Sequence, residues 1–357
     1  MPTLTPGKRT TAASFSLAAA LALVLSSCGA PISGSPVDNP SQESMETAGE
    51  SRGSDDGSRQ GNTSQSAHTG PVSAELPPHD PEVLVEEAAV RDSDAHNKRI
   101  LTLDRAGALS RMVWTLGLGE NLVGRDTASD FPGVSHLPQV TPGGHSINAE
   151  TVLALRPDIV FTDGTIGPSR VIEKLRDAGV KVVSVSEERT PETIGTLVDE
   201  MAAALGLQEQ AKGVKNRIEE QLREATDDAQ SRADGRKMMI LYLRGSGVAM
   251  IAGPDSGGRS LIKRLGGVDA SEKLGITGAF TPLTPEALSA AAPETIIVMR
   301  GGLKSVGGVD GLLEVPGVAH TPAGKSRSVL DVPDSQLLSF GTDTPRTITA
   351  MAEALYG

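Results

Sequence analysis

The amino-acid sequence predicts a two-lobed α/β fold, with parallel sheets covered by helices and the lobes joined by one long backbone helix. Short β-branched runs alternate with amphipathic helical stretches in two series, a pattern typical of helix-covered parallel sheets. A stretch without proline, residues 193–233, separates the two series. Each series also contains a glutamate at a helix start with a proline seven residues later, at Glu150 and at Glu286. This repeat indicates two related lobes.

The first series, residues 95–192, is expected to form the N-terminal lobe. It alternates strands and helices in chain order: strand 99–103, helix 109–118, strand 158–162, helix 170–178 and strand 181–185.

Residues 193–233 are expected to form the connecting helical segment. Apolar residues recur there at helical spacing, as Ile194, Leu197, Met201 and Leu205. The second half is strongly polar on one face, which is typical of a helix that lies at the surface.

The second series, residues 234–357, is expected to form the C-terminal lobe. Its elements in chain order are strand 237–243, helix 258–265, strand 295–299, strand 328–332 and a last helix. Thr344 is the expected N-cap of that helix and Pro345 its first residue, because proline lacks the N–H that a first turn leaves unpaired.

The composition excludes several classes of function. The net charge is −12 and the pI is about 5.1, so a nucleic-acid partner is not expected. Aromatic residues make up only 2% of the chain, with one Trp, two Tyr and five Phe. No P-loop, dinucleotide-binding glycine motif or His-Glu-x-x-His helix is present.

The N-terminal region is expected to export and anchor the protein. Residues 1–27 combine two early basic residues with an apolar run of about 11 residues, too short to span a membrane. The run ends at Leu-Ser-Ser-Cys, which resembles a bacterial lipobox, so Cys28 is the expected lipidation site. Residues 28–85, rich in Ser, Gly, Pro and Asp, are expected to form a disordered tether. The protein is then extracytoplasmic, held at the outer face of the cytoplasmic membrane.

A family resemblance rests on the segment Gly-His-Ser-Ile-Asn-Ala-Glu at 144–150, the two glutamate-bearing helix starts and the long connecting helix. These features resemble the periplasmic-binding-protein family of iron-chelate, cobalamin and haem importers, over residues 95–357. Within that family the chain is most similar to actinobacterial haem-binding lipoproteins. The similarity lies in the Gly-His-x-x-Asn-x-Glu pattern, in Leu-Tyr-Leu-Arg-Gly at 241–245 and in Met-Arg-Gly-Gly at 299–302.

The resemblance implies a binding protein that is not an enzyme. It would capture haem b (iron protoporphyrin IX) in a cleft between the lobes and deliver it to an ABC-type permease. His145 and Tyr242 would be the axial iron ligands, one from each lobe, and Arg244 would modulate Tyr242. Glu150 and Glu286 would dock the permease through its arginines.

The chemistry of these residues agrees with the resemblance. Ferric haem accepts imidazole and phenolate donors, and two ligands from opposite lobes complete the coordination on closure. Tyr242 and Arg244 are two apart on a strand and therefore share a face, where a guanidinium favours the phenolate. His145 lies in a loop after two glycines, and His136 is the rival ligand of this lobe.

Two further residues are expected in the pocket. Met299 would line it or act as a substitute ligand, and Arg300 is one of three arginines, with Arg125 and Arg244, that could pair with the haem propionates.

Alternatives remain open at this stage. The nearest are ferric siderophores and cobalamin, although few aromatic residues exist to line a cobalamin cleft and Trp114 lies in a predicted buried helix. A surface haem enzyme would need an open iron position, which a His-Tyr pair closes. A zinc carrier has less support because the histidines from residue 95 on lack ligand spacing. A purely structural surface adhesin has less support because of the paired glutamates at the two helix starts.

Overall fold

The structure, a computed structural model, describes residues 70–357. The predicted lipoprotein signal peptide, which is the export segment 1–27, lies outside the described residues, as do Cys28 and most of the predicted tether. Between residues 70 and 357, no helix has both the length and the apolar character that crossing a membrane would require.

The first sheet has three parallel strands in the order β2–β3–β4. The strands are β2 (Ile100–Leu103), β3 (Ile159–Thr162) and β4 (Lys181–Ser184). β2 and β3 are buried along their whole length, as expected for strands covered on both faces. The helices of this part are α2 (Ala108–Thr115), α3 (Ala149–Ala154) and α4 (Ser169–Asp177). We refer to the part built on this sheet as the N-terminal lobe.

The second sheet has the strand order β1–β10–β9–β5–β6–β8, with β7 beside the start of β5, and defines the C-terminal lobe. Its strands are β1 (Pro71–Ser73), β5 (Lys237–Arg244), β6 (Val248–Ala252), β7 (Val268–Asp269), β8 (Phe280–Pro282), β9 (Thr295–Met299) and β10 (Val329–Val332). The pairs β5–β6 and β6–β8 are antiparallel and the others are parallel. β5 pairs in parallel with β9 along one edge, while its other edge pairs in parallel with β7 at its start and antiparallel with β6 at its end.

Six helices accompany this second sheet in the described chain. They are α7 (Gly258–Arg264), α8 (Pro285–Ala291), α9 (Arg300–Ser305), α10 (Gly308–Leu313), α11 (Pro322–Ser326) and α12 (Thr344–Tyr356). α12 begins one residue before its predicted start, with Asp343 as N-cap in place of Thr344. The α/β fold predicted from the sequence is confirmed.

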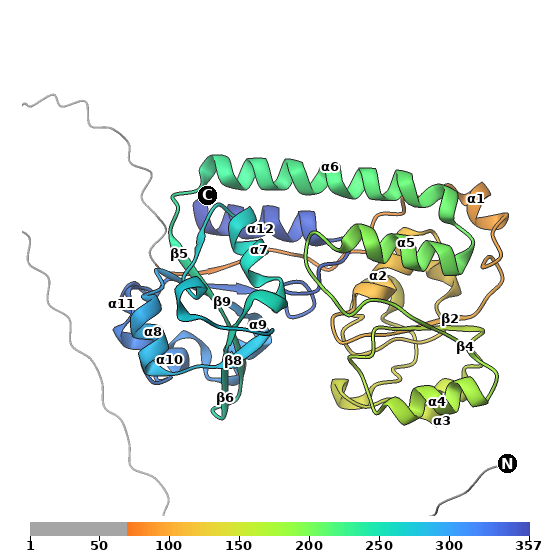
Figure 1. Ribbon diagram of the computed structural model, residues 1–357, viewed down its shortest axis with the longest axis horizontal. Coiled ribbons are helices and arrows are strands. Elements are labelled where there is room, and N and C mark those ends of the chain that lie inside the picture. Colours follow the sequence, from red (N-terminus) through yellow and green to blue (C-terminus); the bar gives the residue numbers. More distant parts are fainter. Residues whose placement is uncertain (1–69) are drawn as a thin grey trace, which may run out of the picture. The chain divides into compact units, whose positions relative to one another are not determined.

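The predicted connecting segment forms two helices (Figure 1). α5 (Ile194–Leu205) ends at Gly206, whose φ of 74° strains any residue with a side chain. α6 (Gln208–Arg232) then continues for 25 residues, about 37 Å. It packs against α5 and α12 through the buried stripe Ala211, Val214, Ile218, Leu222, Ala225 and Ala229. α6 is the long helix that joins the lobes.

The joint between the lobes is packed as a protein interior. One hydrophobic core includes Phe161 of β3, Ile218 of α6 and Ile297 of β9, each at most 2% exposed. A buried ion pair also joins α2 to the start of α12, with 2.5 Å between Arg111 Nη1 and Asp343 Oδ2. Close packing of this kind resists large rearrangement, so lobe movement is expected to be small.

The N-terminal end of the described chain corrects the predicted tether, which was expected to continue to residue 85. Strand β1 pairs in parallel with β10, and Ala74 N donates to Asp331 O at 2.9 Å. Farther along, Leu84 N donates to Thr115 O of the N-terminal lobe at 2.9 Å, before α1 (Glu87–Arg91). Residues 71–85, which we call the strap, therefore cross from one lobe to the other (Figure 1). Composition failed to predict the strap because backbone hydrogen bonds to an existing sheet edge carry little side-chain signal.

Candidate functional site

His145 lies in an exposed loop whose backbone is well fixed. The loop follows a 3₁₀ turn, Pro142–Gly144, in which Gly143 and Gly144 have φ values of 73° and 78° that favour glycine. Ile147 N donates to Gly167 O at 3.1 Å, which ties the loop to the segment after β3. The backbone is therefore anchored while the imidazole is exposed.

Tyr242 and Arg244 lie at the end of β5, on one face of the strand as predicted. Tyr242 is half-buried and Arg244 is exposed. The ring of Tyr242 packs against that of Phe280 on β8, with 5.6 Å between the centroids and 57° between the planes. The phenol is therefore held by an aromatic neighbour at the rim of the C-terminal lobe.

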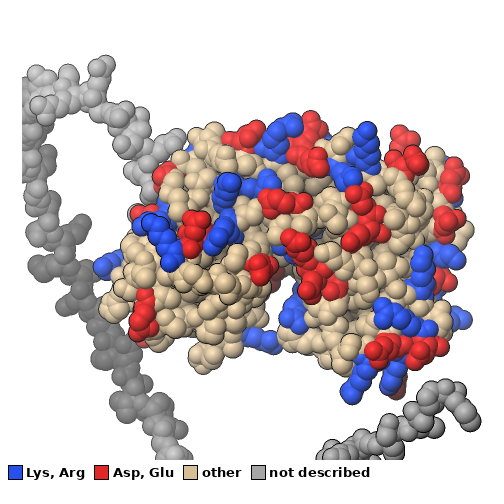
Figure 2. All heavy atoms as spheres, in the orientation of Figure 1, with Lys and Arg blue, Asp and Glu red and all other residues tan. Residues whose placement is uncertain are grey.

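The structure brings His145 and Arg244 together across the two lobes. Arg244 Nη1 donates to His145 Nε2 at 2.8 Å, which requires the lone pair of that nitrogen. Among the described residues Arg244 makes no hydrogen bond to Tyr242, the residue that it was predicted to modulate. Figure 2 shows a hollow between the lobes with basic side chains from both at its edges. The three predicted residues thus form one group, and its direct contact is between histidine and arginine.

The other predicted pocket residues are placed differently. Met299, at the end of β9, is partly buried against the core. Arg300 Nε pairs with Asp331 at 2.5 Å, and its Nη2 donates to Ala74 O at 2.9 Å. The guanidinium of Arg300 is thus held by the strap and β10.

The two other candidate residues of the N-terminal lobe, Arg125 and His136, make no contact with the group of His145, Tyr242 and Arg244 among the hydrogen bonds of the described residues. Arg125 is half-buried, and its guanidinium donates only long hydrogen bonds, of 3.4 Å, to the carbonyls of Asp126 and Ser129 among the described residues. His136 is exposed, and no hydrogen bond joins its ring to any described residue. From residue 70 to 357, no group of three or more metal-ligating side chains is present, and the zinc alternative gains no support.

Glu150 and Glu286 occupy matching positions at two helix starts. Asn148 caps α3 by accepting from Thr151 N at 3.1 Å, and Thr284 caps α8 by accepting from Ala287 N at 3.1 Å. The glutamate follows the cap by two residues in both lobes and is exposed in both. Each side-chain cap accepts one N–H of the first turn, and neither glutamate carboxylate makes a hydrogen bond or ion pair among the described residues, so both can contact another molecule.

A pair of buried acids lies where β2 ends, and sequence reasoning missed it. Asp104 Oδ2 accepts from Ala108 N at 2.9 Å, and Asp126 Oδ2 accepts from Asp104 N at 3.2 Å. Both side chains are fully buried. Burial raises the pKa of Asp126 to about 6, partly offset by hydrogen bonds from Ser129, and burial with the charge of Asp126 raises the pKa of Asp104. The pair supports the start of α2.

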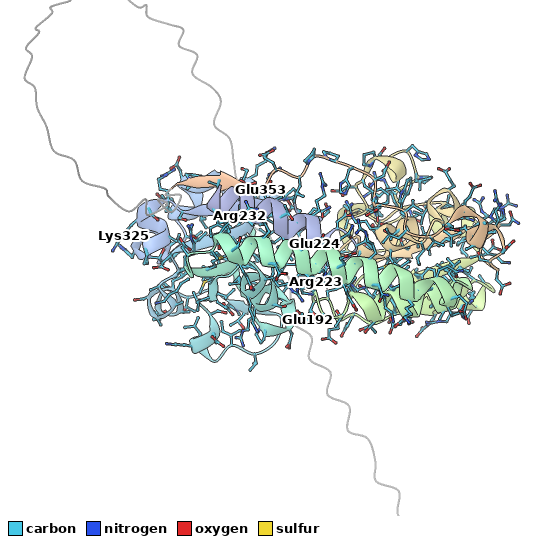
Figure 3. The ribbon with its side chains drawn as sticks, turned by 90° about the horizontal axis from the view of Figure 1, so that it is seen from above. Glu192, Arg223, Glu224, Arg232, Lys325 and Glu353 are labelled. Atoms are coloured by element: carbon cyan, nitrogen blue, oxygen red, sulfur yellow. The ribbon has the colours of Figure 1, made fainter. Side chains whose placement is uncertain are left out.

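Three pockets lie away from His145 and Tyr242. One of about 380 Å³ includes Glu192 and Arg223, and one of about 530 Å³ includes Glu224 and Asp343. Figure 3 shows Arg223 and Glu224 on α6, along which both pockets lie. A third, of about 510 Å³, lies beside Lys181 of β4. None of the three pockets is lined by a predicted site residue, so none is part of the candidate site.

Fold and site together define a two-lobed ligand-binding protein. The sequence model of a family described as "Periplasmic binding protein" matches residues 106–336. The chain belongs to the periplasmic binding protein family. Members of this family are binding proteins, which confirms the prediction that the chain is not an enzyme.

Solved and curated proteins place the chain more closely within the family. The structure of heme binding protein HmuT is 37% identical, with a TM-score of 0.72, and covers 81% of this chain and 97% of its own. HmuT variants in which a histidine, an arginine or a tyrosine is replaced by alanine match at 36% identity.

Two curated relatives are more distant. The uncharacterized ABC transporter substrate-binding lipoprotein YvrC of Bacillus subtilis (strain 168) is 22% identical over 281 residues, 77% of this chain and 85% of YvrC. A vitamin B12-binding protein of Photorhabdus laumondii is 26% identical over 114 residues, which are 32% of this chain and 40% of that protein.

Proposed function

We propose that this protein captures haem in the cleft between its lobes and delivers it to an ABC-type import permease. The observation that carries the proposal is the contact of His145 with the end of β5, beside Tyr242, in a chain that is 37% identical to heme binding protein HmuT. An imidazole from one lobe and a phenolate from the other suit the two axial positions of ferric haem. Coordination from both sides would hold the haem between two lobes that move little relative to each other.

Anchoring and delivery belong to the same proposal. YvrC is described as a lipoprotein, which supports lipidation of Cys28 and a location at the outer face of the cytoplasmic membrane. Residues 28–70 would then tether the strap, and with it the C-terminal lobe, to the membrane. Glu150 and Glu286, exposed at matching helix starts of the two lobes, are the proposed contacts for basic residues of the permease.

Cobalamin is the second candidate ligand, because vitamin B12-binding proteins are among the relatives. Their similarity covers only about a third of this chain, whereas the similarity to HmuT covers 81% of it. A ferric siderophore remains the third candidate within the same class.

A titration of the chain from residue 29 onward with hemin tests the proposal. We expect a saturable change in the Soret band at one haem per chain. Parallel titrations with cyanocobalamin and with a ferric siderophore should show no saturable binding. Absence of a hemin shift would refute haem as the ligand, and saturation by cyanocobalamin alone would replace it with cobalamin.

A further inference from the structure

One face of the antiparallel strands β5, β6 and β8 continues outward from Tyr242. Tyr242 lies opposite Met250, and Met250 lies opposite Pro282. Directly opposed residues share a face of a sheet, and so do residues two apart on one strand. Val248, Met250 and Phe280 therefore lie on the same face as Tyr242 and Arg244. We call these five side chains the β5–β8 face.

The β5–β8 face carries two of the five large apolar side chains that are exposed among the described residues, with Arg244 at its edge. Phe280 and Val248 are each 38% exposed, and Met250 is half-buried. The other phenylalanines of the described chain, Phe131, Phe161 and Phe340, are at most 2% exposed. In a chain with so few aromatic residues, an exposed phenylalanine ring against the predicted ligand tyrosine indicates a surface that another molecule covers.

The backbone holds Phe280 firmly in this position. Gly253 N donates to Ala279 O at 2.8 Å, and Leu283 N donates to Ala249 O at 2.9 Å, on either side of β8. A Cβ atom on Gly253 would come within 2.4 Å of Gly278 O, so only glycine permits the backbone segments at 253 and 278 to approach this closely. The ring is therefore presented by a fixed strand, as a preorganised binding surface requires.

The arrangement separates two kinds of recognition. His145, Arg244, Tyr242 and Phe280 form a row, through the contact of His145 with Arg244 and that of Tyr242 with Phe280. His145 and Tyr242 carry donor atoms suited to a metal, and Phe280 at the other end carries a flat hydrocarbon surface. A porphyrin has a metal at its centre and a wide, flat, apolar ring around it, so both ends of the row have a counterpart in the ligand.

We propose that the β5–β8 face is the wall that contacts the porphyrin ring, with Phe280 as a specificity-determining residue, and that it recognises the ring without the iron. This inference rests on the proposed function and adds a substrate class to it: metal-free porphyrins bind at the same site. Iron coordination by His145 and Tyr242 then adds affinity for haem over the metal-free ring.

The experiment compares hemin with metal-free protoporphyrin IX on the chain from residue 29 onward. Hemin binding is followed by absorbance and protoporphyrin binding by fluorescence. Phe280→Ala should weaken both ligands by about 10-fold, because it removes the apolar area that the ring covers. Phe280→Leu should weaken them less. His145→Ala should weaken hemin alone.

Val268→Ala is the matched control. Val268 is an apolar residue that is 48% exposed, on β7 opposite Lys237 at the far end of β5. It should leave the affinity for both ligands unchanged. Thermal unfolding of each variant shows whether it is folded, and Phe280→Leu keeps the test valid if the alanine variant is not.

The outcomes distinguish this inference from the function on which it rests. If wild-type protein binds hemin but not protoporphyrin IX, or if neither Phe280 variant changes either affinity, the wall is wrongly assigned and haem binding stands. If wild-type protein binds no hemin, the proposed function itself is refuted.

Discussion

The hydrogen bond between Arg244 and His145 should couple the stabilities of the two lobes in the absence of haem. The bond is 2.8 Å long, joins a charged donor to a neutral ring nitrogen, and lies between two exposed side chains. A hydrogen bond to a charged group contributes roughly 1.5–3 kcal/mol, whereas exposed charged pairs contribute at most about 1 kcal/mol. Because both side chains are exposed, we expect a coupling of about 0.5–1 kcal/mol.

A double-mutant cycle measures this coupling. Urea unfolding without hemin gives the free energy of unfolding for wild-type protein, Arg244→Ala, His145→Ala and the double variant. The double variant should lose about 0.5–1 kcal/mol less than the sum of the single losses. A control cycle pairs Arg244→Ala with His136→Ala, whose ring has no contact with Arg244 among the described residues, and its losses should add. Additivity within about 0.3 kcal/mol in the first cycle would refute the contact.

Three further predictions concern stability and delivery. Burial raises the pKa of Asp126 from 3.8 to about 6, so folding favours the protonated carboxyl. Its contribution to the free energy of unfolding is complete below pH 3.8 and is lost as the pH rises through 6. The free energy of unfolding of Asp126→Asn, relative to that of wild type, should therefore increase by up to about 3 kcal/mol between pH 4 and pH 7. A difference that does not change with pH would contradict the buried charge. Thermal melts should show a lower midpoint for a chain that starts at residue 86 than for one that starts at residue 70, and equal midpoints would show that the strap is not part of the fold. Haem uptake in cells should fall in Glu150→Ala and Glu286→Ala while hemin affinity stays unchanged, whereas a loss of affinity would place these residues in the binding site.

Much of the fold follows from local pattern alone. Strands such as β3 and β9 are short apolar runs bounded by proline and a charge, and such runs have few other interpretations. The caps at Asn148 and Thr284 combine a capping side chain with an acidic first turn, so the start of each helix is marked in the sequence. The shared face of Tyr242 and Arg244 follows from strand geometry.

What the sequence did not predict depends on contacts between distant segments. The strap is stabilised by pairing with β10, more than 250 residues away, and its own composition indicates disorder. Phe280 lies beside Tyr242 only because β8 pairs with β6. β8 has only three residues, too few for a periodic pattern that would predict a strand from the sequence. Arg244 was expected to act on Tyr242, its neighbour on the strand, but a loop of the other lobe places His145 within reach of its guanidinium.

The visible spectrum of the haem complex, compared between wild-type protein and its ligand variants, tests the central claim most directly. His145→Ala and Tyr242→Ala should each weaken hemin binding and change the Soret and charge-transfer bands, because each removes one axial donor. His136→Ala, the rival histidine, should leave the spectrum as in wild-type protein. Unchanged spectra in both the His145 and the Tyr242 variants would contradict the assignment of the iron ligands, even if haem still bound.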